Sequence, residues 1–130
     1  MLVTDASVAV AASYAPDGFA EFGGERLLAP PLLWSEARSA LHELLWRGEV
    51  PPEDAERAHA CLERCPVERS RERRLGAAAW RVAGEFKWAK TYDAEYVALA
   101  ELCGCRLVTL DARLLRATAR LGFVIGPADL

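Results

Sequence analysis

Short apolar runs alternate with longer segments in which apolar residues recur every three or four positions. The short runs predict buried strands, and the longer periodic segments predict helices. The predicted strands are 2–4, 26–30, 66–68, 106–110 and 123–125. The predicted helices are 6–15, 31–47, 51–65, 70–86, 92–103 and 112–121. Residues 17–25 contain the pair Gly23-Gly24 and are predicted to be irregular.

This alternation also predicts the fold class. Short apolar strands separated by helices are typical of a parallel sheet with helices on both faces. We therefore expect an α/β protein, a three-layer α/β/α sandwich around a parallel sheet. The 130 residues suffice for a single domain, residues 1–130, and no repeat or long linker divides them.

Composition and charge narrow the class of protein further. Apolar residues make up 52% of the chain and charged residues 27%, as in a soluble globular protein. No apolar stretch approaches the roughly 20 residues of a membrane span, and Asp5 stands where a secretory signal would be basic. We therefore expect a cytoplasmic protein without a membrane partner. The net charge of −3 argues against a broad basic surface for nucleic acid but permits a local basic strip.

The four cysteines do not form a recognisable metal motif. They stand at positions 61, 65, 103 and 105, in pairs that do not have the usual spacing of zinc ligands, and the only histidines are His42 and His59. We interpret them as buried thiols of a cytosolic protein.

Four acidic residues lie where predicted strands meet helices or near the starts of helices. Asp5 and Asp111 each follow a strand, and Asp93 lies in the first turn of its helix. Glu36 lies in the first two turns of helix 31–47, at the edge of its apolar stripe. Each acid alone has a simpler explanation, as a helix N-cap, a partner of the helix dipole or a solvated side chain.

Together, the four acids indicate a metal site. The carboxyl ends of parallel strands gather at one edge of a sheet, where ligands bind. Carboxylates brought close together repel one another and raise each other's pKa. A divalent cation resolves this conflict, and Mg²⁺ and Mn²⁺ both prefer oxygen ligands.

A recognisable motif surrounds each acid. The motifs are "VTDASV" around Asp5, "SEARSAL" around Glu36, "TYDAEYVALAE" around Asp93 and "LVTLDARL" around Asp111. In order and spacing they resemble the PIN-domain family, specifically the VapC-type toxins of type II toxin–antitoxin pairs. The resemblance extends along nearly the whole chain, although residues 48–90 carry no matching signature. It implies a five-stranded parallel sheet and metal-dependent endonucleolytic cleavage of RNA.

The resemblance also implies roles for the acids and for partners. Asp5, Glu36, Asp93 and Asp111 match the catalytic quartet of the family. Asp5 and Asp93 would be direct ligands of Mg²⁺ or Mn²⁺, with Glu36 and Asp111 completing the site or holding a second ion. The family further implies a homodimer and a cognate VapB-like antitoxin whose tail would block the site.

Other residues near the motifs have two open interpretations. The hydroxyls of Ser7 and Thr109 could orient Asp5 and Asp111, or could only cap helices. The basic residues Arg69, Arg71, Arg73, Arg74, Lys87 and Lys90 could bind RNA phosphates while Trp88 stacks on an unpaired base. Alternatively, they could form a solvated helix face, with Trp80 and Trp88 in the core or at a dimer interface.

Rival functions fit the sequence less well. Neither histidine lies within a motif, so hydrolysis by a metal-activated water is preferred over a Ser-His-Asp or Cys-His mechanism. A phosphoacceptor receiver domain would need paired acids after the first strand, and a haloacid-dehalogenase-type phosphatase would need an aspartate at position 7, where this chain has Ser7. The serious alternative is a PIN-like module that binds RNA or protein without cutting.

Overall fold

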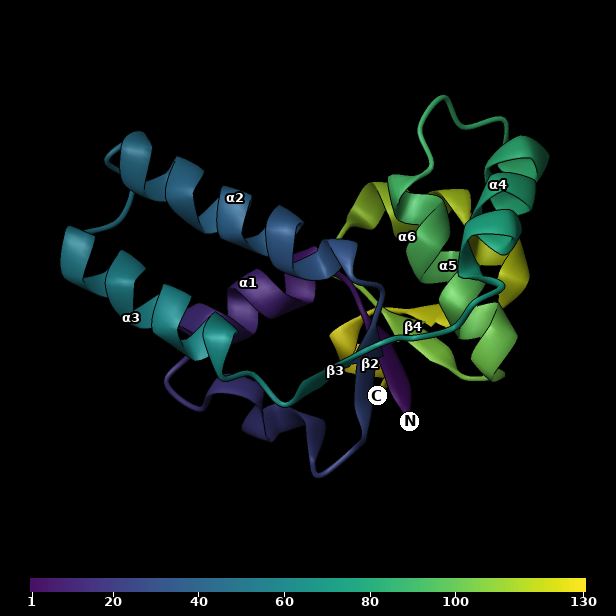
Figure 1. Ribbon diagram of the computed structural model, residues 1–130. Helices are drawn as coiled ribbons and strands as arrows, with labels where there is room; N and C mark the ends of the chain where they lie inside the picture. Colours follow the sequence, from purple (N-terminus) through teal and green to yellow (C-terminus); the bar gives the residue numbers. More distant parts are fainter.

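Five short parallel strands form the centre of the molecule in a computed structural model that describes residues 1–130 (Figure 1). The strands are β1 (Leu2–Thr4), β2 (Leu27–Ala29), β3 (Val67–Arg69), β4 (Arg106–Val108) and β5 (Val124–Ile125). They pair in the order β3-β2-β1-β4-β5, and every pair is parallel. The predicted parallel sheet is therefore confirmed.

Helices cover both faces of this sheet. The helices α1 (Ala6–Tyr14), α2 (Leu32–Trp46) and α3 (Pro52–Glu63) pack against one another on one face. The helices α4 (Leu75–Phe86), α5 (Tyr92–Cys103) and α6 (Ala112–Ala117) lie on the other. Short 3₁₀ helices span Gly18–Phe22, Ala119–Leu121 and Pro127–Asp129. The division into three layers follows from right-handed crossovers between parallel strands. The chain runs from β1 through β2 to β3 on one side of β1, and then crosses to β4 and β5 on the other side. None of the helices is both long and apolar enough to cross a lipid bilayer.

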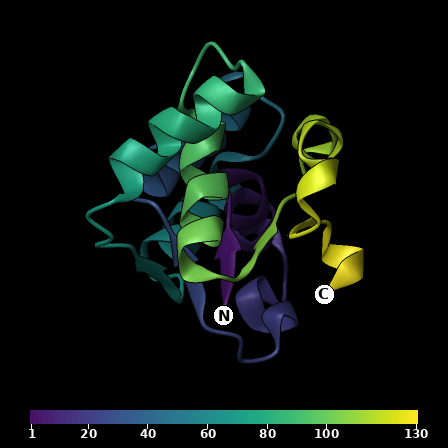
Figure 2. The same cartoon turned by 90° about the vertical axis from the view of Figure 1, so that its right-hand side faces the viewer.

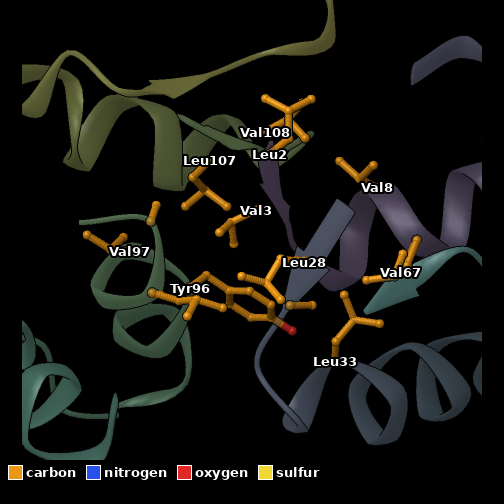
Figure 3. Close-up of a cluster of buried hydrophobic side chains, with 14 of the residues drawn as sticks. Leu2, Val3, Val8, Leu28, Leu33, Val67, Tyr96, Val97, Leu107 and Val108 are labelled. Carbon is orange, nitrogen blue, oxygen red and sulfur yellow. The ribbon is translucent and has the colours of Figure 1, made fainter. Parts of the chain in front are cut away.

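The core lies where β1 and β4 meet α5. Leu2 and Val3 of β1 and Leu107 of β4 are at most 1% exposed. Figure 3 shows Val3 and Leu107 on the side of Tyr96 and Val97 of α5, and Leu2 beside Val108. Residues 96–100 of α5 are all buried, so this helix is apolar on most sides and is enclosed by its neighbours. The ring of Tyr96 is buried with the core, and its hydroxyl points toward the side of α2. Because α5 is fixed in the core, its first turn is held firmly at the edge of the sheet.

Several predicted boundaries were wrong. The helix predicted over 70–86 begins only at Leu75, because residues 70–74 form turns of their own. The Ser70 hydroxyl accepts the Glu72 backbone N–H at 3.1 Å, and the Glu72 carboxylate accepts the Arg74 backbone N–H at 3.0 Å. These side chains offer the backbone an alternative to helical hydrogen bonds.

The last predicted helix and the cysteines also differ from expectation. The helix predicted over 112–121 ends at Ala117 and continues after Thr118 as a separate 3₁₀ turn, which Gly122 ends at a φ of 73°. The four cysteines are free thiols, and each is only half-buried, not buried as predicted.

Candidate active site

The carboxyl ends of β1 and β4 meet at the point where the strand order reverses. The chain moves from β1 outward to β2, and later returns to the other side of β1 as β4. In open α/β sheets, ligands bind in the crevice at such a switch point. Asp5 follows β1 directly, and Thr109 and Asp111 follow β4. The topology therefore brings two segments about 100 residues apart in the sequence to the predicted binding edge.

Asp5 is a buried carboxylate held by three donors. Its side chain is 6% exposed. Oδ1 accepts the Ser7 hydroxyl at 2.6 Å and the Val8 backbone N–H at 3.1 Å, the latter as the N-cap of α1. Oδ2 accepts the hydroxyl of Thr109. Burial raises the pKa of Asp5, the three hydrogen bonds partly offset this, and the negative charge of Asp111 adds to the rise.

Ser7 and Thr109 tie the ends of β1 and β4 together. The Ser7 hydroxyl donates to Asp5 and accepts the Leu110 backbone N–H at 3.0 Å. The Thr109 hydroxyl donates to Asp5 and accepts the Asp111 backbone N–H at 3.0 Å. Ser7 orients Asp5, as one prediction proposed. Thr109 also serves Asp5 and not the carboxylate of Asp111, because β4 ends before it and its side chain turns toward β1.

Asp111 caps α6 and faces the solvent side of the site. Its Oδ1 accepts the backbone N–H groups of Arg113 at 2.8 Å and Leu114 at 3.2 Å. Burial raises the pKa of Asp111, but the Leu114 N–H and the Arg113 side chain outweigh burial and hold the pKa below its ordinary value. Asp111 is therefore ionised and structurally anchored at neutral pH.

Glu36 reaches the site from α2, on the opposite side of the sheet from α5. Its Oε1 accepts the hydroxyl of the buried Tyr96 at 2.7 Å. Burial raises the pKa of Glu36, the Tyr96 hydrogen bond lowers it, and the charges of Asp93 and Asp5 raise it again. The simpler explanation of Glu36 as a solvated residue is therefore wrong, because the side chain is half-buried and bonded to a core tyrosine.

Asp93 lies in the first turn of α5 and is paired with Arg113. The Arg113 Nη2 lies 3.2 Å from Asp93 Oδ2 and 3.2 Å from Asp111 Oδ2. Arg113 is 73% exposed, while Asp93 is 34% and Asp111 32% exposed. A cation thus already bridges two of the predicted metal-binding carboxylates, from a side chain free to move into solvent.

Electrostatic influence links the four predicted acids pair by pair. Asp5 is influenced by Asp111, and Glu36 by both Asp5 and Asp93. No three of them are close enough to ligate one ion as they stand. Mg²⁺ is ordinarily held by one or two carboxylates with waters completing its octahedron, so a set of three is not required. The donors are all carboxylate oxygens, and the electropositive Arg113 group already lies between two of them, so the residues fit a hard divalent cation.

A pocket of about 630 Å³ opens beside these acids. Glu36, Asp93 and Arg113 line it, together with the segment Lys87–Lys90 that precedes α5.

The arginines at 69–74, which the sequence also suggested as RNA-binding residues, lie away from this pocket's lining. Arg69 lies 4.1 Å from the centre of the Trp34 ring, and Arg74 pairs with Glu72.

Two residues of the site were missed by reasoning from the sequence. Tyr96 follows Asp93 by three positions, so helical spacing makes the two residues neighbours on the surface of α5. Arg113 follows Asp111 by two positions, within the first turn of α6. The spacing was visible in both cases, but the partner of each residue comes from another element, and only the fold brings it near.

Known proteins share both the sequence and the fold of this chain. It is 40% identical over 116 residues to VapC ribonuclease Mb0985 of Mycobacterium bovis and to ribonuclease VapC9 of Mycobacterium tuberculosis, over 88% of this chain and 88% of each relative. The crystal structure of PAE2754 from Pyrobaculum aerophilum superposes with a TM-score of 0.76 at 29% identity, covering 98% of this chain and 91% of that chain. No protein-family profile matches the sequence.

Proposed function

The chain belongs to the VapC family of PIN-domain ribonucleases, and we propose that it is a metal-dependent endoribonuclease that cuts single-stranded or loop RNA. One observation supports this most strongly. Asp5 and Asp111 follow the neighbouring strands β1 and β4 at the switch point of the sheet, and Glu36 and Asp93 line a pocket together with Arg113, which pairs with Asp111. This arrangement suits a reaction at a phosphodiester, in which charge must be stabilised on several oxygens.

In the proposed site, Asp5 and Asp93 hold Mg²⁺ or Mn²⁺, and Glu36 and Asp111 complete the site or hold a second ion. A bound divalent cation lowers the pKa of a coordinated water and polarises a phosphoryl oxygen. Ser7, the serine beside Asp5, is not available as a nucleophile, because its hydroxyl is hydrogen-bonded to Asp5 and Leu110.

The protein's own side chains prepare this site. Ser7, Thr109 and the Val8 N–H fix the orientation of Asp5, so its carboxylate needs little reorganisation. The Tyr96 hydroxyl donates a hydrogen bond to Glu36 Oε1. Glu36 Oε2 can therefore accept a hydrogen bond from solvent or substrate. Arg113 relieves repulsion between the exposed acids and can turn toward a substrate phosphate when another cation takes its place.

Cleavage of a labelled single-stranded RNA tests this proposal. The wild type is expected to cut with Mg²⁺ or Mn²⁺ and not in EDTA, and Asp5→Asn and Asp93→Asn should each lower the rate at least about 100-fold. Asp17→Asn is the matched control, because Asp17 is exposed and its side chain makes no hydrogen bond or ion pair. Binding of RNA without metal-dependent cleavage would instead support the non-cleaving module.

We further propose that the protein acts in the cytoplasm as a homodimer and pairs with a VapB-like antitoxin. Light scattering of the purified protein tests the dimer. The antitoxin is tested by co-expression with the small open reading frame expected directly upstream. A stable complex that suppresses cleavage is the predicted result, and the absence of such a reading frame would favour a housekeeping nuclease.

A further inference from the structure

We propose that Lys87 and Lys90 form a phosphate clamp that holds the RNA backbone against the candidate active site. This proposal rests on the proposed ribonuclease function and assigns its substrate-binding residues. Both lysines lie in the loop between α4 and α5 and line the same pocket as Glu36 and Asp93. In Figures 1 and 2 this loop extends beyond the start of α5.

The distribution of basic residues singles out this loop. The chain has 16 lysines and arginines, but its only lysines are Lys87 and Lys90. Both are exposed, and neither forms an ion pair, whereas Arg113 across the pocket is paired with two acids. A lysine ammonium is a compact charge on a flexible stem with three donors, which suits a phosphate whose position varies. The acids repel an RNA backbone, so free positive charge beside them is what binding requires.

The backbone at Lys87 indicates that its side chain is kept for a purpose other than folding. Helix α4 ends with Lys87 at a φ of 57°, in the left-handed region that disfavours residues with a side chain. Helices α2 and α5 end with the same pair of backbone hydrogen bonds, and there the equivalent residues are Gly48 and Gly104. Lysine therefore occupies a position that glycine would fill with less strain.

The loop is also fixed in place. The Lys87 N–H donates to the Gly84 carbonyl at 3.2 Å, and the Trp88 N–H donates to the Ala83 carbonyl at 2.9 Å. The half-buried Trp88 ring stacks on Phe86, with 4.8 Å between ring centres. Trp88 thus anchors the segment, and both lysine side chains remain on the wall of the pocket.

RNA binding at several salt concentrations tests the clamp. The Asp5→Asn protein, which should not cut, is titrated with a labelled single-stranded RNA, alone and with Lys87→Gln, Lys90→Gln or both. Each lysine variant should weaken binding several-fold and reduce the dependence of log K on log salt by about 0.7, as expected for one lost phosphate contact. Arg64→Gln is the control, because Arg64 is exposed, unpaired and distant from the pocket lining, and it should change neither value.

Two further measurements keep the outcome decisive. Lys87→Gly removes the ammonium while relieving the left-handed backbone. If its thermal unfolding shows that it is at least as stable as the wild type, loss of binding in this variant comes from the missing ammonium. In the cutting protein, the lysine variants should raise KM several-fold with little change in kcat. If the wild type cuts RNA and the lysine variants show unchanged affinity, salt dependence and KM, the clamp is overturned and the proposed nuclease function stands. Lysine-dependent RNA binding by a wild type that does not cut would support the clamp and overturn the proposed nuclease.

Discussion

Asp5 and Asp111 each use Oδ1 to cap a helix and Oδ2 to accept a hydrogen bond from a side chain. Asp5 Oδ1 accepts the Val8 N–H, while its Oδ2 accepts Thr109. Asp111 Oδ1 accepts two N–H groups of α6, while its Oδ2 faces Arg113. Because the helix fixes one oxygen of each carboxylate, the other is held at the switch point. Capping and ligand binding are therefore compatible roles for the same residue.

Asp5→Asn should be at least as stable as the wild type at neutral pH without metal. The fold raises the pKa of Asp5 above its ordinary 3.8, so keeping it ionised at pH 7 opposes folding. Asparagine keeps an acceptor for the Val8 N–H and removes the charge. Acidification protonates the folded wild type first, so any advantage of the variant should shrink as pH falls from 7 toward 4.

Urea unfolding in EDTA across this pH range measures the difference between the two proteins. Asp17→Asn, at an exposed aspartate, should match the wild type throughout. If Asp5→Asn proves markedly less stable than the wild type at pH 7, Asp5 serves the fold more than the site.

Tyr96→Phe should destabilise the protein by about 1 kcal/mol, because a buried hydroxyl bonded to Glu36 is lost. The same change should raise the pKa of Glu36, since the Tyr96 hydrogen bond lowers it. Chemical denaturation gives the stability, and the pH dependence of RNA cleavage should shift upward. Tyr92→Phe, one turn earlier in α5 and 56% exposed, is the control for removing a tyrosine hydroxyl in the unfolding measurement. An unshifted pH profile would show that Tyr96 only fills the core.

At the scale of elements, the C-terminal end of α4 allows a prediction about the stability of the protein. Lys87→Gly should raise the free energy of unfolding by up to about 1 kcal/mol, because glycine adopts positive φ without steric cost. The reciprocal change Gly104→Lys, at the matching end of α5, should lower it by a similar amount. Thermal unfolding of both variants measures this pair. A destabilised Lys87→Gly would mean that the lysine side chain contributes to folding.

The elements themselves were largely predictable from the sequence, and the errors have local causes. Alternation of apolar runs and helical segments identified all five strands, including β3 and β5, which are only partly buried. The start of α4 was misplaced because Ser70 and Glu72 bond the backbone of 70–74 into turns, which hydrophobic periodicity does not register. Prediction therefore fails where side chains compete for backbone hydrogen bonds.

At the scale of the whole molecule, the topology assembles the site. The four acids were predicted because three of them stand at strand ends or helix starts, which a parallel sheet collects at one edge. The contacts of Tyr96 with Glu36 and of Arg113 with Asp93 were not predictable in the same way. Each joins elements 20 or more residues apart, and their pairing depends on how α2, α5 and α6 pack.

The central claim is that these acids bind a divalent cation, and a crystal soaked in Mn²⁺ tests it most directly. Anomalous scattering should show an ion within about 2.3 Å of carboxylate oxygens of Asp5 and Asp93, with the Arg113 guanidinium displaced from between Asp93 and Asp111. The same soak of Asp93→Asn should lose or weaken the peak. A fully soaked wild-type crystal with Mn²⁺ bound elsewhere and none at these acids would contradict the account.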